Sequence, residues 1–180
     1  MKKTIGIILL ILLLFLLKDS DIFKGKEKDP AFVTVPEDFC FAITWDCYGI
    51  SSYDSATGTL IKTKDATHPE DYITTLHLTE EQLKEVYLKL TEEIDLYSYN
   101  HKYNPFPRGY ASSPTQTIIL SMKENGKEKT VLCENIPFGD ESKMKNQKAR
   151  RFMRVKDEIV AMICDTKEWK SLPDYEFGYD

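Results

Sequence analysis

Strict alternation of apolar and polar residues marks the first predicted strand. In the segment 39–47, FCFAITWDC, every second side chain is apolar and falls on one face: Phe39, Phe41, Ile43, Trp45 and Cys47. Because successive side chains of a strand point to opposite faces, this pattern predicts a strand with one buried face. The segments 59–63 and 71–78 are rich in β-branched and aromatic residues and are predicted to be further strands.

Two later segments have the period of an amphipathic helix. Thr79 and Gln82 have the spacing of a capping box, which predicts a helix over 80–94. Its apolar stripe consists of Leu83, Val86, Tyr87, Leu90 and Ile94. The second helix is predicted over 147–164. Its stripe consists of Phe152, Val155, Ile159, Met162 and Ile163, and Arg150, Arg154 and Asp157 face the opposite way.

Two turn signals predict hairpins. Asn125 and Gly126 stand between apolar runs and suit a tight turn with two positive φ angles. The segment 55–58 has the form of a turn closed by a left-handed Gly58, joining the strand 39–47 to the strand 59–63. We expect Asp54 and Ser55 to hydrogen-bond the backbone of that turn, although their side chains also allow a functional site.

The order of these elements predicts an α+β fold. We expect an antiparallel sheet of four to five strands, built from two hairpins plus one strand, with two helices packed on one face. An N-terminal hydrophobic helix is expected to precede it. The chain accordingly divides into a signal peptide or membrane anchor at 1–18, a charged tether at 19–32 and a single domain at 33–180.

The N-terminal segment determines the expected location. Lys2 and Lys3 precede an uncharged run over 4–17, and Lys18 follows it. Its fourteen residues would span about 21 Å as a helix, less than the roughly 30 Å of a bilayer core. That length suits an uncleaved anchor with lysines at its ends or a cleaved signal peptide, and a buried helix is a third alternative. We expect a domain held at the cell membrane and facing outside, or secreted after cleavage.

Charge and cysteine content narrow the possible partners. The chain has a net charge of −5, from 24 basic and 29 acidic residues. Three of the lysines lie in residues 1–18, so the rest carries 21 bases against 29 acids, a net charge of −8, and phosphate would repel it. We therefore expect no nucleic acid as partner. The four cysteines lack the pair spacing of a metal site, and either separate thiols or a bridge from Cys40 or Cys47 to Cys133 or Cys164 fits the sequence.

Signatures of catalysis are missing from the sequence. It has no G-x-S-x-G, H-E-x-x-H, P-loop, G-x-G-x-x-G or C-x-x-C motif. Asp54, Ser55 and His68 have the residue types of a Ser-His-Asp triad. They are not expected to form one, because neighbouring Ser and Asp side chains rarely face the same imidazole ring. The sequence predicts no catalytic residue, no metal and no cofactor, and it favours binding over catalysis. The alternative is a cell-envelope hydrolase with an unrecognised site near 53–55 or His68.

Two segments are candidates for a partner surface. The first, LYSYNHKYNPFPRGY, combines aromatic residues with prolines, and tyrosines of this kind either bind a peptide or glycan or fasten a long connection to the core. Its aromatic residues are Tyr97, Tyr99, Tyr103, Phe106 and Tyr110. The second, 143–156, has seven bases and no acid. Its Arg150, Arg151 and Arg154 form either a solvated face or a contact for an envelope protein, a glycan or an anionic surface.

The layout as a whole resembles a family of small exported bacterial domains of unknown function. The similarity rests on CYGISSYDSATGTL, LTEEQL, TIILSMKENGKEKTV and TKEWKSLP, and it spans about 39–173. Members carry an early Cys-x-Gly-x-Cys-Pro-x-Tyr motif, of which Cys47 and Gly49 are present here, and Tyr53 lies one position before the place of the motif's tyrosine. Ser51 and Ser52 replace the second cysteine and the proline, so no thiol chemistry carries over. The resemblance implies an exported α+β domain and no known activity.

Overall fold

The computed structural model describes residues 33–110, 112–138 and 141–178. The predicted anchor at 1–18 and the tether at 19–32 lie outside the described residues. Contacts divide the chain into two units, Met1–Thr34 and Val35–Asp180. Every helix, strand and core residue described below belongs to the second unit, which therefore supplies its own hydrophobic core.

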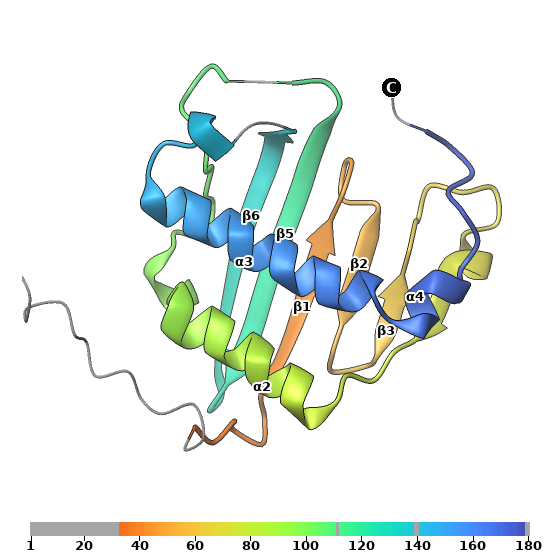
Figure 1. Ribbon diagram of the computed structural model, residues 1–180, viewed down its shortest axis with the longest axis horizontal. Helices are drawn as coiled ribbons and strands as arrows, with labels where there is room; N and C mark the ends of the chain where they lie inside the picture. Colours follow the sequence, from red (N-terminus) through yellow and green to blue (C-terminus); the bar gives the residue numbers. More distant parts are fainter. Residues whose placement is uncertain (1–32, 111, 139–140, 179–180) are drawn as a thin grey trace, which may run out of the picture. The chain divides into compact units, whose positions relative to one another are not determined.

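The second unit has an α+β fold built on one antiparallel sheet (Figure 1). Its strands lie in the order β4-β3-β2-β1-β5-β6, so β1 is central and pairs with β2 on one side and β5 on the other. The strand bounds are β1 Cys40–Trp45, β2 Ser51–Asp54, β3 Thr59–Ile61, β4 Ile73–Thr75, β5 Thr115–Glu124 and β6 Lys127–Pro137. The α+β class is confirmed, but the sheet has six strands and not the predicted four to five.

The alternating pattern of the first strand is confirmed. Phe41, Ile43 and Trp45 are buried on one face of β1, and Cys40, Ala42 and Thr44 lie half-buried on the other. Burial of one large apolar side chain of this kind stabilises the fold by about 1.5–3 kcal/mol, which fixes the face that β1 turns toward the helices.

Strand β2 was not predicted. The strands predicted over 39–47 and 59–63 are not joined directly, because β2 lies between them and pairs with both. The strand has the sequence SSYD, and serine and aspartate have low strand propensity. Neighbouring strands override that propensity, because they bury Ser51 and Tyr53 and supply hydrogen bonds along both edges of β2.

The predicted strand over 71–78 is shorter than expected. Residues Pro69–Tyr72 form a 3₁₀ helix, and only Ile73–Thr75 pair with β3 as β4. Pro69 begins that helix, since its fixed φ suits the first turn of a helix. The Leu76 N–H donates to the Gly58 carbonyl at 2.8 Å, one position beyond the last paired residue of β4.

Two helices cross the same face of the sheet (Figure 1). Helix α2, Glu80–Leu88, starts at the predicted capping box of Thr79 and Gln82 and continues as a π-helical turn, Lys89–Glu93. Helix α3 spans Gln147–Cys164, as predicted, and the short α4, Lys167–Ser171, follows it. Their apolar stripes meet the buried side chains of β1, β5 and β6 in one core. No helix within 33–110, 112–138 or 141–178 has the length and apolar character needed to cross a membrane.

Both predicted turns are present. Asn125 and Gly126 have φ of 48° and 71° between β5 and β6. Gly58 has φ of 72°, and the Asp54 carboxylate accepts a hydrogen bond from the Ala56 N–H at 2.8 Å, as expected for the second turn. Ser55 differs from the prediction, because its hydroxyl accepts from the Phe41 N–H at 2.8 Å and so ties the turn to β1.

Substitution of Gly58 tests this turn. A Cβ atom at Gly58 would lie 2.9 Å from the His77 ring and 3.0 Å from the Leu76 carbonyl oxygen, in addition to the positive φ. We expect Gly58→Ala to lower the free energy of unfolding by about 2 kcal/mol in urea denaturation. Gly126→Ala is the matched control, because φ is positive there and no atom lies within 4 Å. It should cost only about 1 kcal/mol. Equal costs would contradict the close approach at Gly58.

Candidate functional site

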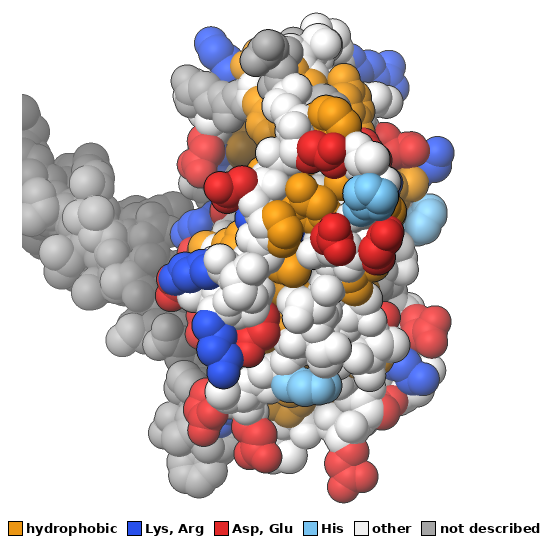
Figure 2. Space-filling view, turned by 90° about the vertical axis from the view of Figure 1, so that its right-hand side faces the viewer, with side chains coloured by type: hydrophobic (Ala, Val, Ile, Leu, Met, Phe, Trp, Pro, Cys, Tyr) orange, Lys and Arg blue, Asp and Glu red, His pale blue; other side chains and the backbone are white. Residues whose placement is uncertain are grey.

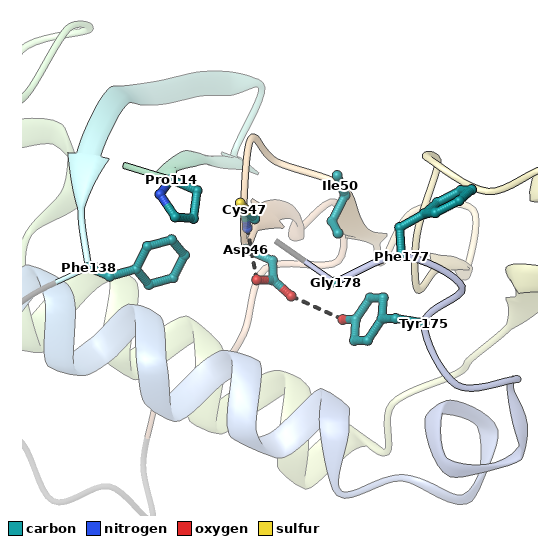
Figure 3. A pocket seen from close by; sticks show the side chains of 8 residues that line it. All are labelled: Asp46, Cys47, Ile50, Pro114, Phe138, Tyr175, Phe177 and Gly178. Carbon is teal, nitrogen blue, oxygen red and sulfur yellow. Dashed lines mark hydrogen bonds between the residues drawn. The ribbon is translucent and has the colours of Figure 1, made fainter. Parts of the chain in front are cut away.

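A hollow lies at one end of the sheet (Figure 3). Strand β5 runs antiparallel to both β1 and β6, so the C-terminal ends of β1 and β6 lie beside the N-terminal end of β5, at one end of the sheet. The residues that follow or precede these points surround a volume of about 560 Å³. We call this space the end-of-sheet hollow, and it is lined by Asp46, Cys47, Ile50, Pro114, Phe138, Tyr175, Phe177 and Gly178.

A strained loop forms one wall. Between β1 and β2, Asp46, Tyr48 and Gly49 have φ of 74°, 52° and 69°. A left-handed residue other than glycine costs roughly 1–2 kcal/mol, so the surrounding structure has to hold it. The Tyr48 N–H donates to the Thr115 carbonyl at 2.9 Å, and the Gly49 N–H donates to the Asp46 carbonyl at 3.1 Å. A Cβ at Gly49 would lie 3.0 Å from the Thr44 side chain, which explains the glycine.

This loop places the Asp46 carboxylate in the hollow. Its Oδ1 accepts a hydrogen bond from the Cys47 N–H at 2.8 Å, and its Oδ2 accepts one from the Tyr175 hydroxyl at 3.0 Å. Both donors are neutral. In the part of the chain that the structure describes, no lysine or arginine forms an ion pair with Asp46. The carboxylate is thus fixed in position while its charge has no cationic partner among these residues.

The C-terminal segment 172–178 forms the opposite wall, and we call it the C-terminal strap. Three contacts hold it against the β3–β4 connection. The Lys62 ammonium donates to the Leu172 carbonyl at 3.3 Å, the Tyr72 hydroxyl donates to the Asp174 carbonyl at 3.1 Å, and the Thr67 N–H donates to the Glu176 carboxylate at 2.6 Å. Figure 2 shows the side of β4 and this segment, where exposed hydrophobic side chains gather among acidic ones.

Lys62 is the anchor of the strap. Its side chain is buried, at 7% exposure, and its ammonium lies 5.6 Å from the ring centre of Trp169 and 5.4 Å from that of Tyr175. Both rings therefore offer it cation–π attraction. Burial raises the pKa of the Tyr175 phenol above its usual range, so the hydroxyl stays protonated and donates to Asp46.

A second hollow of about 490 Å³ adjoins the first. The two share Asp46, Phe138 and Tyr175, and the second extends along α3 to Lys156 and Cys164. Lys156 is buried and pairs with Asp157. Together the two hollows form a continuous, largely aromatic and aliphatic lining around the Asp46 carboxylate.

The cysteines here are not activated nucleophiles. All four cysteines are free thiols, with Cys47 and Cys133 buried and Cys40 and Cys164 half-buried. Burial raises the pKa of the Cys47 thiol above its usual value and that of Cys164 to about 11. Both therefore stay protonated near neutral pH, whereas a reactive thiol has a lowered pKa.

The tyrosine segment is mostly folded into the core. Tyr99 and Phe106 are buried, and Tyr103 and Tyr110 are half-buried. The Tyr99 and Tyr103 rings meet edge to face at 4.9 Å, and both contact Phe152 of α3. Tyr110 stacks on Phe106 at 5.1 Å. Of the five aromatic residues, Tyr97 alone is exposed, so these side chains form no continuous aromatic surface.

The three arginines do come together. Arg150, Arg151 and Arg154 are exposed on α3 and line a shallow hollow of about 350 Å³ with Glu141 and Gln147. Each is partly engaged within the protein. Arg154 pairs with Glu93 and lies 3.8 Å from Glu158, Arg151 donates to the Glu93 carbonyl at 3.4 Å, and Arg150 donates to the Glu141 carbonyl at 3.4 Å.

The residues of the hypothetical hydrolase have other partners. His68 is exposed and lies 3.6 Å from Glu70, and Asp54 and Ser55 hold the β2–β3 turn. Tyr53 is buried, and its hydroxyl donates to the Leu76 carbonyl at 3.2 Å. Within the described ranges, no group of three or more His, Cys, Asp or Glu residues has the arrangement of a metal site.

Sequence reasoning missed the end-of-sheet hollow. Asp46 falls on the polar face of the first strand, where it reads as an ordinary outward residue. In the segment DYEFGYD, residues 174–180, aromatic residues alternate with acidic ones. This pattern could have marked Tyr175 as a candidate for a functional site. Nothing local, however, indicates that Tyr175 returns to Asp46, 129 positions earlier.

Two conservative substitutions test the packing of the tyrosine segment. The Tyr103 hydroxyl is buried without a hydrogen-bond partner among the described residues, whereas the Tyr99 hydroxyl donates to the Lys148 carbonyl at 3.2 Å. We expect Tyr103→Phe to leave the free energy of unfolding unchanged or to raise it by up to about 1 kcal/mol. Tyr99→Phe should lower it by about 1 kcal/mol in the same urea denaturation. Equal losses in the two variants would show that the Tyr103 hydroxyl has a partner.

Comparison with known proteins gives no relative for this chain. No protein-family model, no curated protein and no solved structure matches it. The resemblance to small exported bacterial domains therefore stays a prediction, and the function has to be argued from the site itself.

Proposed function

We propose that the chain is a membrane-anchored or secreted extracytoplasmic module that binds a small, largely apolar ligand in the end-of-sheet hollow. The observation that carries the proposal is the hollow itself. It has about 560 Å³, within the range of small-molecule sites, and apolar side chains and one fixed carboxylate line it.

The location is proposed from the sequence of residues 1–18. Two lysines followed by fourteen uncharged residues suit an anchor or a signal peptide. The net negative charge of residues 19–180 makes nucleic acid a poor partner. It is compatible with a membrane anchor and with a cleaved signal peptide.

Binding without catalysis is supported by the chemistry of the lining. The Cys47 and Cys164 thiols and the Tyr175 phenol all have raised pKa values, which keep them in their neutral forms near pH 7. A general base or nucleophile needs a pKa matched to its task. The alternative, a cell-envelope hydrolase using residues near 53–55 or His68, has weaker support, because those side chains hold turns or lie exposed.

Fluorescence titration with a neutral apolar probe tests the proposal. We expect residues 33–180, which contain the whole described core, to bind N-phenyl-1-naphthylamine with enhanced probe emission. Phe138 lines the hollow and is 46% exposed, so Phe138→Ala should leave the fold intact. It should weaken binding about tenfold, since loss of one aromatic contact costs about 1–2 kcal/mol.

The neutralised variant R150Q/R151Q/R154Q is the control, because these arginines lie outside the lining of the end-of-sheet hollow and glutamine places no like charge beside Glu93 and Glu158. It should bind the probe within twofold of the unaltered protein. Absence of probe binding would contradict the proposal. Loss of binding in the arginine variant with none in Phe138→Ala would place the ligand at the arginines instead.

A further inference from the structure

The charge of the end-of-sheet hollow points to one chemical class of ligand. We infer that the hollow takes a small organic cation, an ammonium group on an apolar or aromatic body, with Asp46 as its counter-ion. The inference rests on the proposed function and adds the ligand chemistry.

Among the residues that the structure describes, no lysine or arginine forms an ion pair with Asp46. The two buried lysines nearest the lining have other partners. Lys62 donates to the Leu172 carbonyl and lies 3.9 Å from Asp174, and Lys156 pairs with Asp157. The donors to Asp46 are a backbone N–H and a phenol, which orient the carboxylate without neutralising it.

Aromatic rings lie on both sides of the Asp46 carboxylate (Figure 3). In Figure 3, Phe138 and Tyr175 stand on opposite sides of Asp46, while the Phe177 ring points away from it. An aromatic face attracts a cation through its negative potential, and it also covers the apolar part of an organic ammonium ion. The Phe138 ring is 46% exposed and can cover a ligand, whereas Tyr175 turns its hydroxyl to Asp46 and already has Lys62 at 5.4 Å from its ring centre. An aromatic ring beside a carboxylate suits this class of ligand better than an anion or a neutral alcohol.

Charged side chains also line the two hollows. Asp46 and Glu141 line the adjoining hollow together with the Lys156–Asp157 pair, which carries no net charge. The arginine hollow on α3 shares Glu141 with this one, and each of its three arginines contacts an acceptor of the protein. The local charge therefore favours entry of a cation, in agreement with the negative charge of the chain.

The left-handed conformation of Asp46 allows a substitution that removes its charge without changing the backbone. Asparagine tolerates the left-handed region as well as aspartate does, so Asp46→Asn should keep the loop at φ near 74° and the hydrogen bond from the Cys47 N–H to Oδ1. Its amide NH2 donates to the Tyr175 hydroxyl oxygen instead of accepting from it, so the substitution removes the charge and reverses one hydrogen bond. Asp54→Asn is the matched control, because it removes the same charge at the other end of β2, where Asp54 holds the β2–β3 turn.

The test is a ligand-observed NMR titration of the full chain, in a neutral detergent, with four ligands that share a phenyl ring and differ in charge: benzylammonium, benzyltrimethylammonium, benzyl alcohol and benzoate. We expect both cations to bind at least tenfold more tightly than the alcohol or benzoate. Asp46→Asn should reduce that preference to less than twofold, and Asp54→Asn should preserve it.

The outcomes separate the two proposals. If benzyl alcohol binds as tightly as benzylammonium, or if the preference survives in Asp46→Asn, the inference of a cationic ligand is wrong while the binding function stands. If none of the four ligands binds, and N-phenyl-1-naphthylamine does not bind either, the proposed function fails and this inference fails with it.

Discussion

The reversal of the chain after β1 is the constraint on which the rest of the structure depends. Strand β1 is central and pairs on both edges, so the next residues have to leave the sheet and return as β2 within five positions, 46–50. Three left-handed residues, Asp46, Tyr48 and Gly49, accomplish this. The same conformation places the Asp46 carboxylate in the hollow, so the geometry that completes the sheet also builds the candidate site.

The C-terminal strap completes that site from the other end of the chain. Lys62 is buried between Trp169 and Tyr175 and holds the strap, and Tyr175 then fixes Asp46. A carboxylate held by a rigid loop on one side and a phenol on the other suits recognition of a charged group. Burial raises the pKa of the Cys47 and Cys164 thiols and of the Tyr175 phenol, so these groups beside the carboxylate are neutral near pH 7.

Local sequence patterns predicted the helices and strands that bury a periodic apolar face. They did not predict the features that form only through contacts between distant parts of the chain. The alternation of 39–47, the capping box at Thr79 and the bounds of α3 were read correctly because each signal lies within a few residues. Strand β2 was missed because its neighbours stabilise it. The hollow was missed for the same reason, since Asp46 and Tyr175 come together only in the folded chain.

The account depends most on the position of a bound cation. A crystal structure of the protein with benzylammonium would locate it directly. We predict the ammonium nitrogen about 2.7–2.9 Å from an Asp46 carboxylate oxygen, with the ring between Phe138 and Tyr175. A ligand bound elsewhere, with Asp46 still contacting only Cys47 and Tyr175, would contradict the account.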